Sequence, residues 1–207
     1  MIVIDELKEA VNIMLHPGTA TQKERSIPAA VAFYYKVLVV PFILYIILAL
    51  AIPEPTVSSS FIPSPFFTTI LMLILTPFTV VTGVLASLIV LPLGLLVVAF
   101  LCHIIGKLLK VFNNPYSYTF TATVYSMVPY LLLVWLLVFT NIVNPMLIVG
   151  IAIIFFILAI WEIIILIIAF ANQQKTSKLR AFAVWLVTGI VIAIIYLALV
   201  GGAVLAR

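Results

Sequence analysis

Long apolar runs separated by short polar or proline-rich segments dominate the chain. The clearest run extends from Met146 to Ala171 and contains a single charged residue, Glu162. About twenty consecutive apolar residues are enough to cross the hydrocarbon core of a bilayer. Similar runs recur, and we expect five transmembrane helices at about residues 33–52, 87–109, 118–139, 146–171 and 181–204. Pro129 is predicted to kink the third span, because proline cannot donate a helical hydrogen bond.

The segment before the first span has a different pattern, with apolar residues at helical spacing. One face of a helix over residues 4–15 would carry Ile4, Leu7, Val11, Met14 and Leu15, and the other Asp5, Lys8, Glu9 and Asn12. Such a pattern predicts an amphipathic helix, either lying on the membrane surface or docked on the rest of the protein. Residues 1–30 are therefore expected to form a cytoplasmic amphipathic segment and connector, and residues 31–207 a single five-span domain.

Basic residues orient the spans, because the loops on the cytoplasmic side of a membrane are enriched in lysine and arginine. They cluster in three places: Lys23, Arg25 and Lys36; Lys107 and Lys110; Lys175, Lys178 and Arg180. All three clusters lie on the cytoplasmic side only if residues 66–110 cross the membrane once. Residues 66–82 are then interfacial, re-entrant or a tilted extension. The N-terminus is expected in the cytoplasm and the C-terminus on the opposite side.

Composition supports this assignment and limits the partners. The chain is 66% hydrophobic and 8% charged, whereas soluble domains are roughly 45–50% apolar and about 25% charged. A soluble globule of this size could not bury so much apolar surface. The sequence therefore predicts an all-α polytopic membrane protein. A dispersed net charge of +4 gives no reason to expect a nucleic-acid partner, and Cys102, the single cysteine, allows neither an intrachain disulfide nor a cysteine metal cluster.

Three ionisable residues inside or beside the spans are candidates for a polar site. Glu162 lies roughly 15 Å from the cytoplasmic end of its span, and His103 roughly 10 Å from the end of another. Ionisable groups inside membranes often mark ion pathways, so Glu162 is either a proton or cation site or a hydrogen-bonded carboxyl linking helices. The similar depths suggest a contact between His103 and Glu162. Lys107, one turn from His103, is expected to extend to the interface.

Catalytic motifs are missing from the sequence. The only aspartate, Asp5, lies outside the spans, so there is no pair of intramembrane aspartates and no aspartate cluster for Mg²⁺. The two histidines, His16 and His103, do not form an HExxH motif, and neither a GxSxG turn nor a Walker loop occurs. We therefore expect no enzyme, and no catalytic, cofactor-binding or metal-binding residues.

Several short motifs occur in a characteristic order. HIIGKLLK (103–110) ends one span, and YSYTFTATVYSMVP (116–129) enters the next. A later span contains Ile160-Trp161, and the polar segment NQQKTSKLRA (172–181) leads into the last. Upstream, LHPG (15–18) precedes AAVAFYYKVLVVPFILYIIL (29–48). In this order the chain resembles the YIP family, the Ypt/Rab-interacting membrane proteins, in its prokaryotic branch.

The resemblance implies a five-span fold with a cytoplasmic N-terminus. In eukaryotes the family is associated with small-GTPase recruitment, vesicle trafficking and membrane shaping. The DLYGP-like motif and the long cytosolic N-terminal region of those proteins are missing here, so small-GTPase binding is doubtful for this chain. We expect a non-enzymatic membrane protein that contacts lipids and binds protein partners or a second copy, or shapes the membrane. The alternative is a small transporter or channel subunit with a proton or cation site at Glu162.

Overall fold

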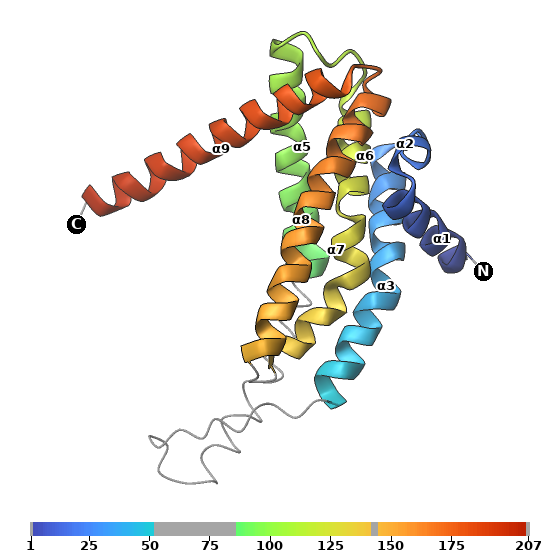
Figure 1. Ribbon diagram of the computed structural model, residues 1–207. Helices are drawn as coiled ribbons and strands as arrows, with labels where there is room; N and C mark the ends of the chain where they lie inside the picture. The colour runs from blue at the N-terminus through green and yellow to red at the C-terminus, as the bar shows by residue number, and fades with distance from the viewer. Residues whose placement is uncertain (1, 52–85, 142–144, 206–207) are drawn as a thin grey trace.

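The computed structural model describes residues 2–51, 86–141 and 145–205, which are helical apart from short connections. The predicted interfacial or re-entrant segment, residues 66–82, lies outside the described residues. In chain order the helices are α1 (Ile2–Leu15), α2 (Pro17–Ala20), α3 (Ile27–Ala51), the π-helix η1 (Ala86–Val90), α5 (Leu91–Leu108), α6 (Tyr116–Ser126), α7 (Val128–Leu133), the 3₁₀-helix η2 (Val134–Asn141), α8 (Pro145–Gln173) and α9 (Lys178–Leu205) (Figure 1).

Five helical stretches are long and apolar enough to cross a membrane. They are Ile27–Leu48, Leu88–Leu108, Tyr116–Phe139, Met146–Gln173 and Lys178–Ala198. The predicted all-α polytopic membrane fold is therefore confirmed. Each helix can extend past its apolar part, because the hydrogen bonds within a helix pair the backbone N–H and C=O groups both inside and outside the bilayer. For example, α3 already begins at Ile27, with Pro28 in its first turn, where a missing N–H is tolerated.

The third span is the central helix of the bundle. Inside the structure 56% of it is buried, compared with 17–28% of the other spans. It is built from α6, α7 and η2, and the helix is interrupted at Met127, directly before α7 begins. Pro129 lies in the first turn of α7, so it cannot donate a hydrogen bond to the preceding turn, and the predicted irregularity occurs here.

Small and hydroxyl-bearing residues allow α6 to take this central position. Thr119, Thr121, Thr123 and Ser126 are all buried, and small side chains let helices approach closely inside a membrane. The Thr123 hydroxyl donates to the carbonyl oxygen of Thr119 at 2.9 Å, and the Ser126 hydroxyl donates to that of Thr123 at 2.8 Å. Both polar groups are therefore satisfied within α6 itself.

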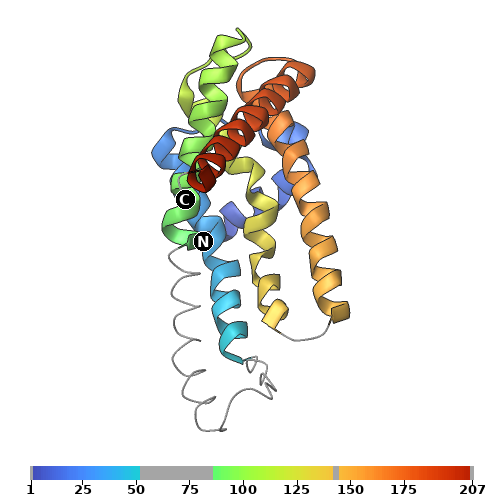
Figure 2. The same cartoon turned by 90° about the vertical axis from the view of Figure 1, so that its left-hand side faces the viewer.

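The last helix, α9, leaves the bundle. Figure 1 shows it leaning away from the other helices, and in Figure 2 its far end comes toward the viewer. Ala181, Val184 and Thr188, near its beginning, are buried against the bundle. From Ile192 to Leu197 every side chain of α9 is exposed.

Several connections meet at one end of the bundle, at the top of Figure 1. They are the α5–α6 loop, the α8–α9 loop and the short helix α2 with the connector that follows it, residues 21–26. The first two are hydrogen-bonded, since the Asn114 backbone N–H donates to Gln174 Oε1 at 2.9 Å. We call this end the loop end. It contains the candidate site.

Candidate functional site

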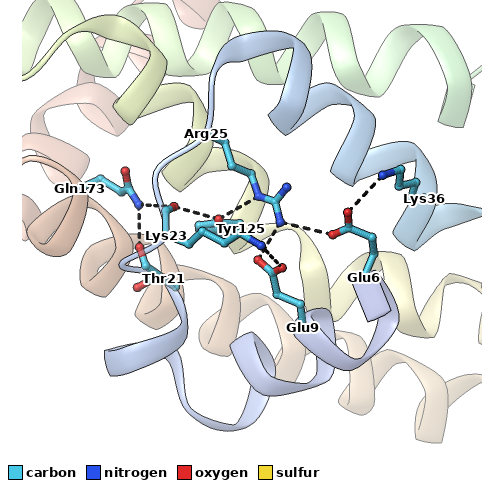
Figure 3. Close-up of polar contacts among 8 residues, drawn as sticks. All are labelled: Glu6, Glu9, Thr21, Lys23, Arg25, Lys36, Tyr125 and Gln173. Carbon is cyan, nitrogen blue, oxygen red and sulfur yellow. Dashed lines mark hydrogen bonds and ion pairs between the residues drawn. The ribbon is translucent and has the colours of Figure 1, made fainter. Parts of the chain in front are cut away.

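Arg25 is the centre of a polar network that joins α1 and the connector to the helix bundle (Figure 3). Its side chain is only 9% exposed. One guanidinium nitrogen, Nη2, donates to Glu9 Oε1 at 2.7 Å and to Glu6 Oε2 at 3.3 Å, and Nε donates to the Tyr125 hydroxyl at 3.0 Å. The guanidinium carbon lies 4.4 Å from the centroid of the Phe33 ring, in a cation–π arrangement. A single side chain therefore links α1, α3 and α6.

Two lysines complete the charge balance around Arg25. Lys36 Nζ lies 3.2 Å from Glu6 Oε1, and Lys23 Nζ lies 2.7 Å from Glu9 Oε2. Each glutamate therefore has two cationic partners. Burial by itself raises the pKa of Glu9, but hydrogen bonds from Lys23 and Arg25 and their positive charges outweigh it and hold the pKa below its ordinary value.

Arg25 is also held in its charged form. Burial alone lowers the pKa of Arg25, but its hydrogen bonds to Glu9 and Tyr125 outweigh burial and raise the pKa above its ordinary value. The Tyr125 hydroxyl in turn donates to the carbonyl oxygen of Lys23 at 3.0 Å. Arg25 and Glu9 therefore stay ionised at neutral pH, and the hydrogen bonds of Arg25 and Tyr125 fix the connector against α6.

Side-chain amides at the end of α8 hold the other half of the connector. Gln173 Nε2 donates to the carbonyl oxygens of Thr21, at 2.7 Å, and Lys23, at 2.9 Å. Asn172 Nδ2 donates to the Thr21 hydroxyl at 2.8 Å and to the Gly18 carbonyl oxygen at 3.0 Å. Gln173 is 2% exposed, and no described residue donates to its Oε1. The connector is therefore anchored mainly through its backbone carbonyls.

A further chain of hydrogen bonds crosses from α5 to the end of α8. His103 Nδ1 lies 2.8 Å from the Thr119 hydroxyl oxygen on α6, and Gln174 Nε2 donates to that oxygen at 3.0 Å. The His103 ring also packs edge-on against Tyr116, with ring centroids 5.7 Å apart. Thus α5, α6 and the start of the α8–α9 loop meet at Thr119.

The structure separates the residues that the sequence suggested as one polar site. His103 faces Thr119, and Lys107 Nζ donates to the carbonyl oxygen of Asn113 at 3.1 Å, in the α5–α6 loop. Glu162 is half-buried in α8, and no described residue gives it a hydrogen bond or an ion pair. His103 and Glu162 are not brought together.

Depth explains the separation. His103 is about 8 Å from the end of α5 at Leu108, whereas Glu162 is about 17 Å from the end of α8 at Gln173, at 1.5 Å per residue. Hydrogen bonds through the Thr119 hydroxyl also join His103 to Gln174, which lies twelve residues beyond Glu162, about 18 Å along the helix at 1.5 Å per residue.

The Arg25 network was missed by sequence reasoning because its members are ordinary polar residues in separate segments. Arg25 and Tyr125 are a hundred positions apart and meet only through the fold. A signal was available in α6, where the tyrosine lies among three threonines inside a predicted span. Another was the pair Gln173-Gln174 at the end of a long apolar run.

The arrangement favours holding helices together rather than catalysis. The hydrogen-bonding groups of the network are mostly used by one another, and its cations face carboxylates of the same chain. Among the described residues, no group of three or more histidine, cysteine, aspartate or glutamate side chains could hold a metal ion. The network can nevertheless hold α1 reversibly against the bundle, because it consists of ion pairs that changes in pH and salt concentration can weaken.

Together, five helices that are long and apolar enough to cross a membrane define the class: an integral membrane protein built from helices. A family model for the Yip1 domain matches residues 11–201, and the chain belongs to this family. This confirms the resemblance to the YIP family. No curated protein and no solved structure matches the chain. Trp161, part of the Ile160-Trp161 motif, has a structural role here, since its indole N–H donates to the Met14 carbonyl oxygen of α1 at 2.9 Å.

Proposed function

We propose that this protein is a non-enzymatic member of its family that binds other membrane proteins, or a second copy of itself, through α9. Membership of the Yip1 domain family supports this, because the family consists of membrane proteins not known as enzymes. The organisation of the surrounding membrane would follow from these contacts.

The observation that carries the proposal is the departure of α9 from the bundle (Figures 1 and 2). Ile190 and Ile194 lie one turn apart on its exposed surface, and a side chain added at Gly189 would meet nothing within 4 Å. Gly189 and Ala193 form a small-xxx-small spacing, which lets a second transmembrane helix approach closely. A helix so little covered by the described parts of its own chain offers a long surface to a partner helix.

We further propose that the loop end faces the cytoplasm, with the N-terminus there and the C-terminus on the opposite side. Residues 1–30 would be the cytoplasmic segment, and residues 31–207 the five-span domain. Lys107, Lys110, Lys175, Lys178 and Arg180 all lie at the loop end, whereas the described residues at the other end carry no charge. This distribution follows the rule that cytoplasmic loops are enriched in basic residues.

Site-directed photo-crosslinking in the membrane tests the role of α9. A photoreactive amino acid replaces Ile190 or Ile194, and the matched control carries it at Val97, on the exposed face of α5. We expect discrete protein adducts from the α9 positions and mainly lipid adducts from Val97. If the α9 positions give no more protein adducts than Val97, then α9 is only a lipid-facing helix and the proposal fails.

A second candidate function follows from Glu162. We propose, as the alternative, that it is the proton or cation site of a small transporter or channel subunit, and the support is the lack of a hydrogen-bonding or ion-pair partner among the described residues. A charged carboxylate inside a membrane is costly, and ionisable residues in spans typically mark substrate or ion pathways. Carbodiimide labelling in nanodiscs across pH tests it. Labelling that a transported ion blocks would favour the transporter, and no labelling at any pH would exclude it.

A further inference from the structure

An apolar groove lies between α1 and α3. It has a volume of about 440 Å³ and is lined by Val3, Ile4, Leu7, Lys8 and Val11 of α1 and Val40 of α3. No polar atom contributes to its lining surface, so Lys8 lines it with its methylene stem. The groove is open on one side. Of the described parts of the chain, only these two helices form its walls.

The exposed surface next to the groove is continuous with the membrane-facing side of α3. Val39, Val40, Ile43 and Ile47 on α3 are exposed, as is Ile4 on α1, which is 60% exposed. In a protein that resides in a bilayer, such aliphatic surfaces face lipid chains. The occupant of the groove must therefore be compatible with a hydrocarbon environment.

The level of the groove follows from the ion pair between Glu6 and Lys36. Lys36 is the only charged residue of α3, so the hydrocarbon region begins within about a turn of it. The contact of 3.2 Å between Lys36 Nζ and Glu6 Oε1 fixes the first half of α1 at that level. Val40, one turn further along α3, then lies just inside the hydrocarbon, and the groove crosses the boundary between headgroups and acyl chains.

Lys8 supplies a positive charge at this boundary. It is exposed, and no described residue forms a hydrogen bond or an ion pair with its ammonium group. Lys8 lies one turn after Ile4 in α1, and α1 runs toward the loop end (Figure 1). A cation at the edge of an apolar groove is complementary to a lipid whose anionic phosphate adjoins its acyl chains.

We propose that the α1–α3 groove binds one acyl chain of an anionic glycerophospholipid, with the lipid phosphate at Lys8. The bilayer supplies this ligand at high local concentration. The acyl chain covers the apolar surface of Val3, Leu7, Val11 and Val40, and the phosphate pairs with the Lys8 ammonium group. This site lies on the opposite side of the bundle from α9 (Figure 1). It therefore does not depend on the proposed partner binding, and either proposal can fail without the other.

Photolabelling by lipids in nanodiscs tests the site. The full-length protein is placed in phosphatidylcholine nanodiscs with a trace of phosphatidylglycerol or phosphatidylcholine that carries a diazirine in one acyl chain, and labelled peptides are mapped by mass spectrometry. We expect the phosphatidylglycerol probe to label the groove residues of α1 in preference to the phosphatidylcholine probe. Lys8→Gln should lower that preference about fivefold, which corresponds to about 1 kcal/mol for one lysine near an anionic surface.

Matched variants separate the groove from general lipid contact. Val40→Trp should fill the groove and suppress labelling of α1 by both probes, whereas Val97→Trp, on the exposed face of α5, should leave it unchanged. Lys178→Gln, an exposed lysine of α9, is the control for Lys8→Gln. Equal labelling of α1 by the two probes would refute the role of Lys8. Labelling of α1 that survives Val40→Trp in a folded protein would refute the groove.

Discussion

Replacement of Arg25 by methionine tests whether the polar network holds α1 in place. Methionine keeps an unbranched apolar side chain beside Phe33 but removes the bonds to Glu6, Glu9 and Tyr125. Removing one partner of a buried ion pair costs about 3–5 kcal/mol. Here Lys36 and Lys23 still neutralise the two glutamates. We therefore expect a loss near the lower limit, about 3 kcal/mol.

Hydrogen exchange in nanodiscs measures this loss locally. When an amide exchanges through rapid local opening, its rate is proportional to the opening constant. A loss of about 3 kcal/mol should therefore accelerate exchange of the α1 amides by about a hundredfold. The second half of α8 should change little. Arg25→Lys should give an intermediate acceleration, because lysine keeps the charge but not the planar fork of donors.

Arg180→Met is the matched control, since Arg180 is exposed at the start of α9. We expect it to leave the exchange of α1 unchanged. If Arg25→Met accelerates α1 exchange by less than about threefold, which is below 1 kcal/mol, then packing of Ala10 and Ile13 holds α1 and the network is incidental. If α8 is accelerated as much as α1, Arg25 supports the whole bundle rather than the docking of one helix.

Three further outcomes follow from the structure. The pKa of Glu9 is lower in the docked state than its ordinary value of 4.5, so its contribution to docking is complete well above pH 4.5 and is lost as pH falls below it. The protection of the α1 amides, which is the slowing of their exchange relative to that of an unstructured peptide at the same pH, should therefore fall there, and Glu9→Gln should remove most of that dependence. Gly106→Ala should destabilise the protein by about 1–3 kcal/mol in chemical unfolding, because the new Cβ would overlap the buried Phe112 ring, whereas Gly150→Ala, with open space around it, should be neutral or slightly stabilising. Lys175→Gly should raise stability by up to about 1 kcal/mol in the same assay, because Lys175 has a φ of 51°, in the left-handed region that favours glycine.

The spans were predictable because their signal is local. Each requires only a run of apolar residues, and the run can be identified without knowing which helices are neighbours. The boundaries were less predictable. The last helix begins at Lys178 rather than near 181, and the third span at Tyr116 rather than 118, because a helix continues through polar residues at the membrane surface. The position of α9 outside the bundle has no signal in its apolar composition.

The polar site was only partly predictable, and for a physical reason. The sequence suggested Glu162 and His103 as candidate site residues because ionisable residues are rare in membrane spans. Rarity, however, indicates neither the partner of a side chain nor the direction in which it points. The pairing of His103 with Thr119 depends on how α5 packs against α6. The role of Arg25 depends on three segments meeting at the loop end. Such contacts between distant segments follow from the packing of the bundle, which the sequence pattern does not specify.

The orientation of α1 differs from the rule for soluble proteins, in which the polar face of an amphipathic helix turns outward. The sequence pattern placed Glu9 on the polar face, which in a soluble protein would face outward. In the structure Glu6 and Glu9 face the bundle, while Ile4, Val11 and Leu15 are exposed.

Lipid chains are as apolar as the interior of a helical bundle, so turning these aliphatic residues inward would gain little. Turning the glutamates outward would separate them from Arg25, which would leave a buried guanidinium without its carboxylates. At the membrane boundary, therefore, ion pairs act together with the packing of Ala10 and Ile13 to determine which face of α1 meets the protein. The apolar face remains available to lipid, and this is why the α1–α3 groove can exist on the outside of the bundle.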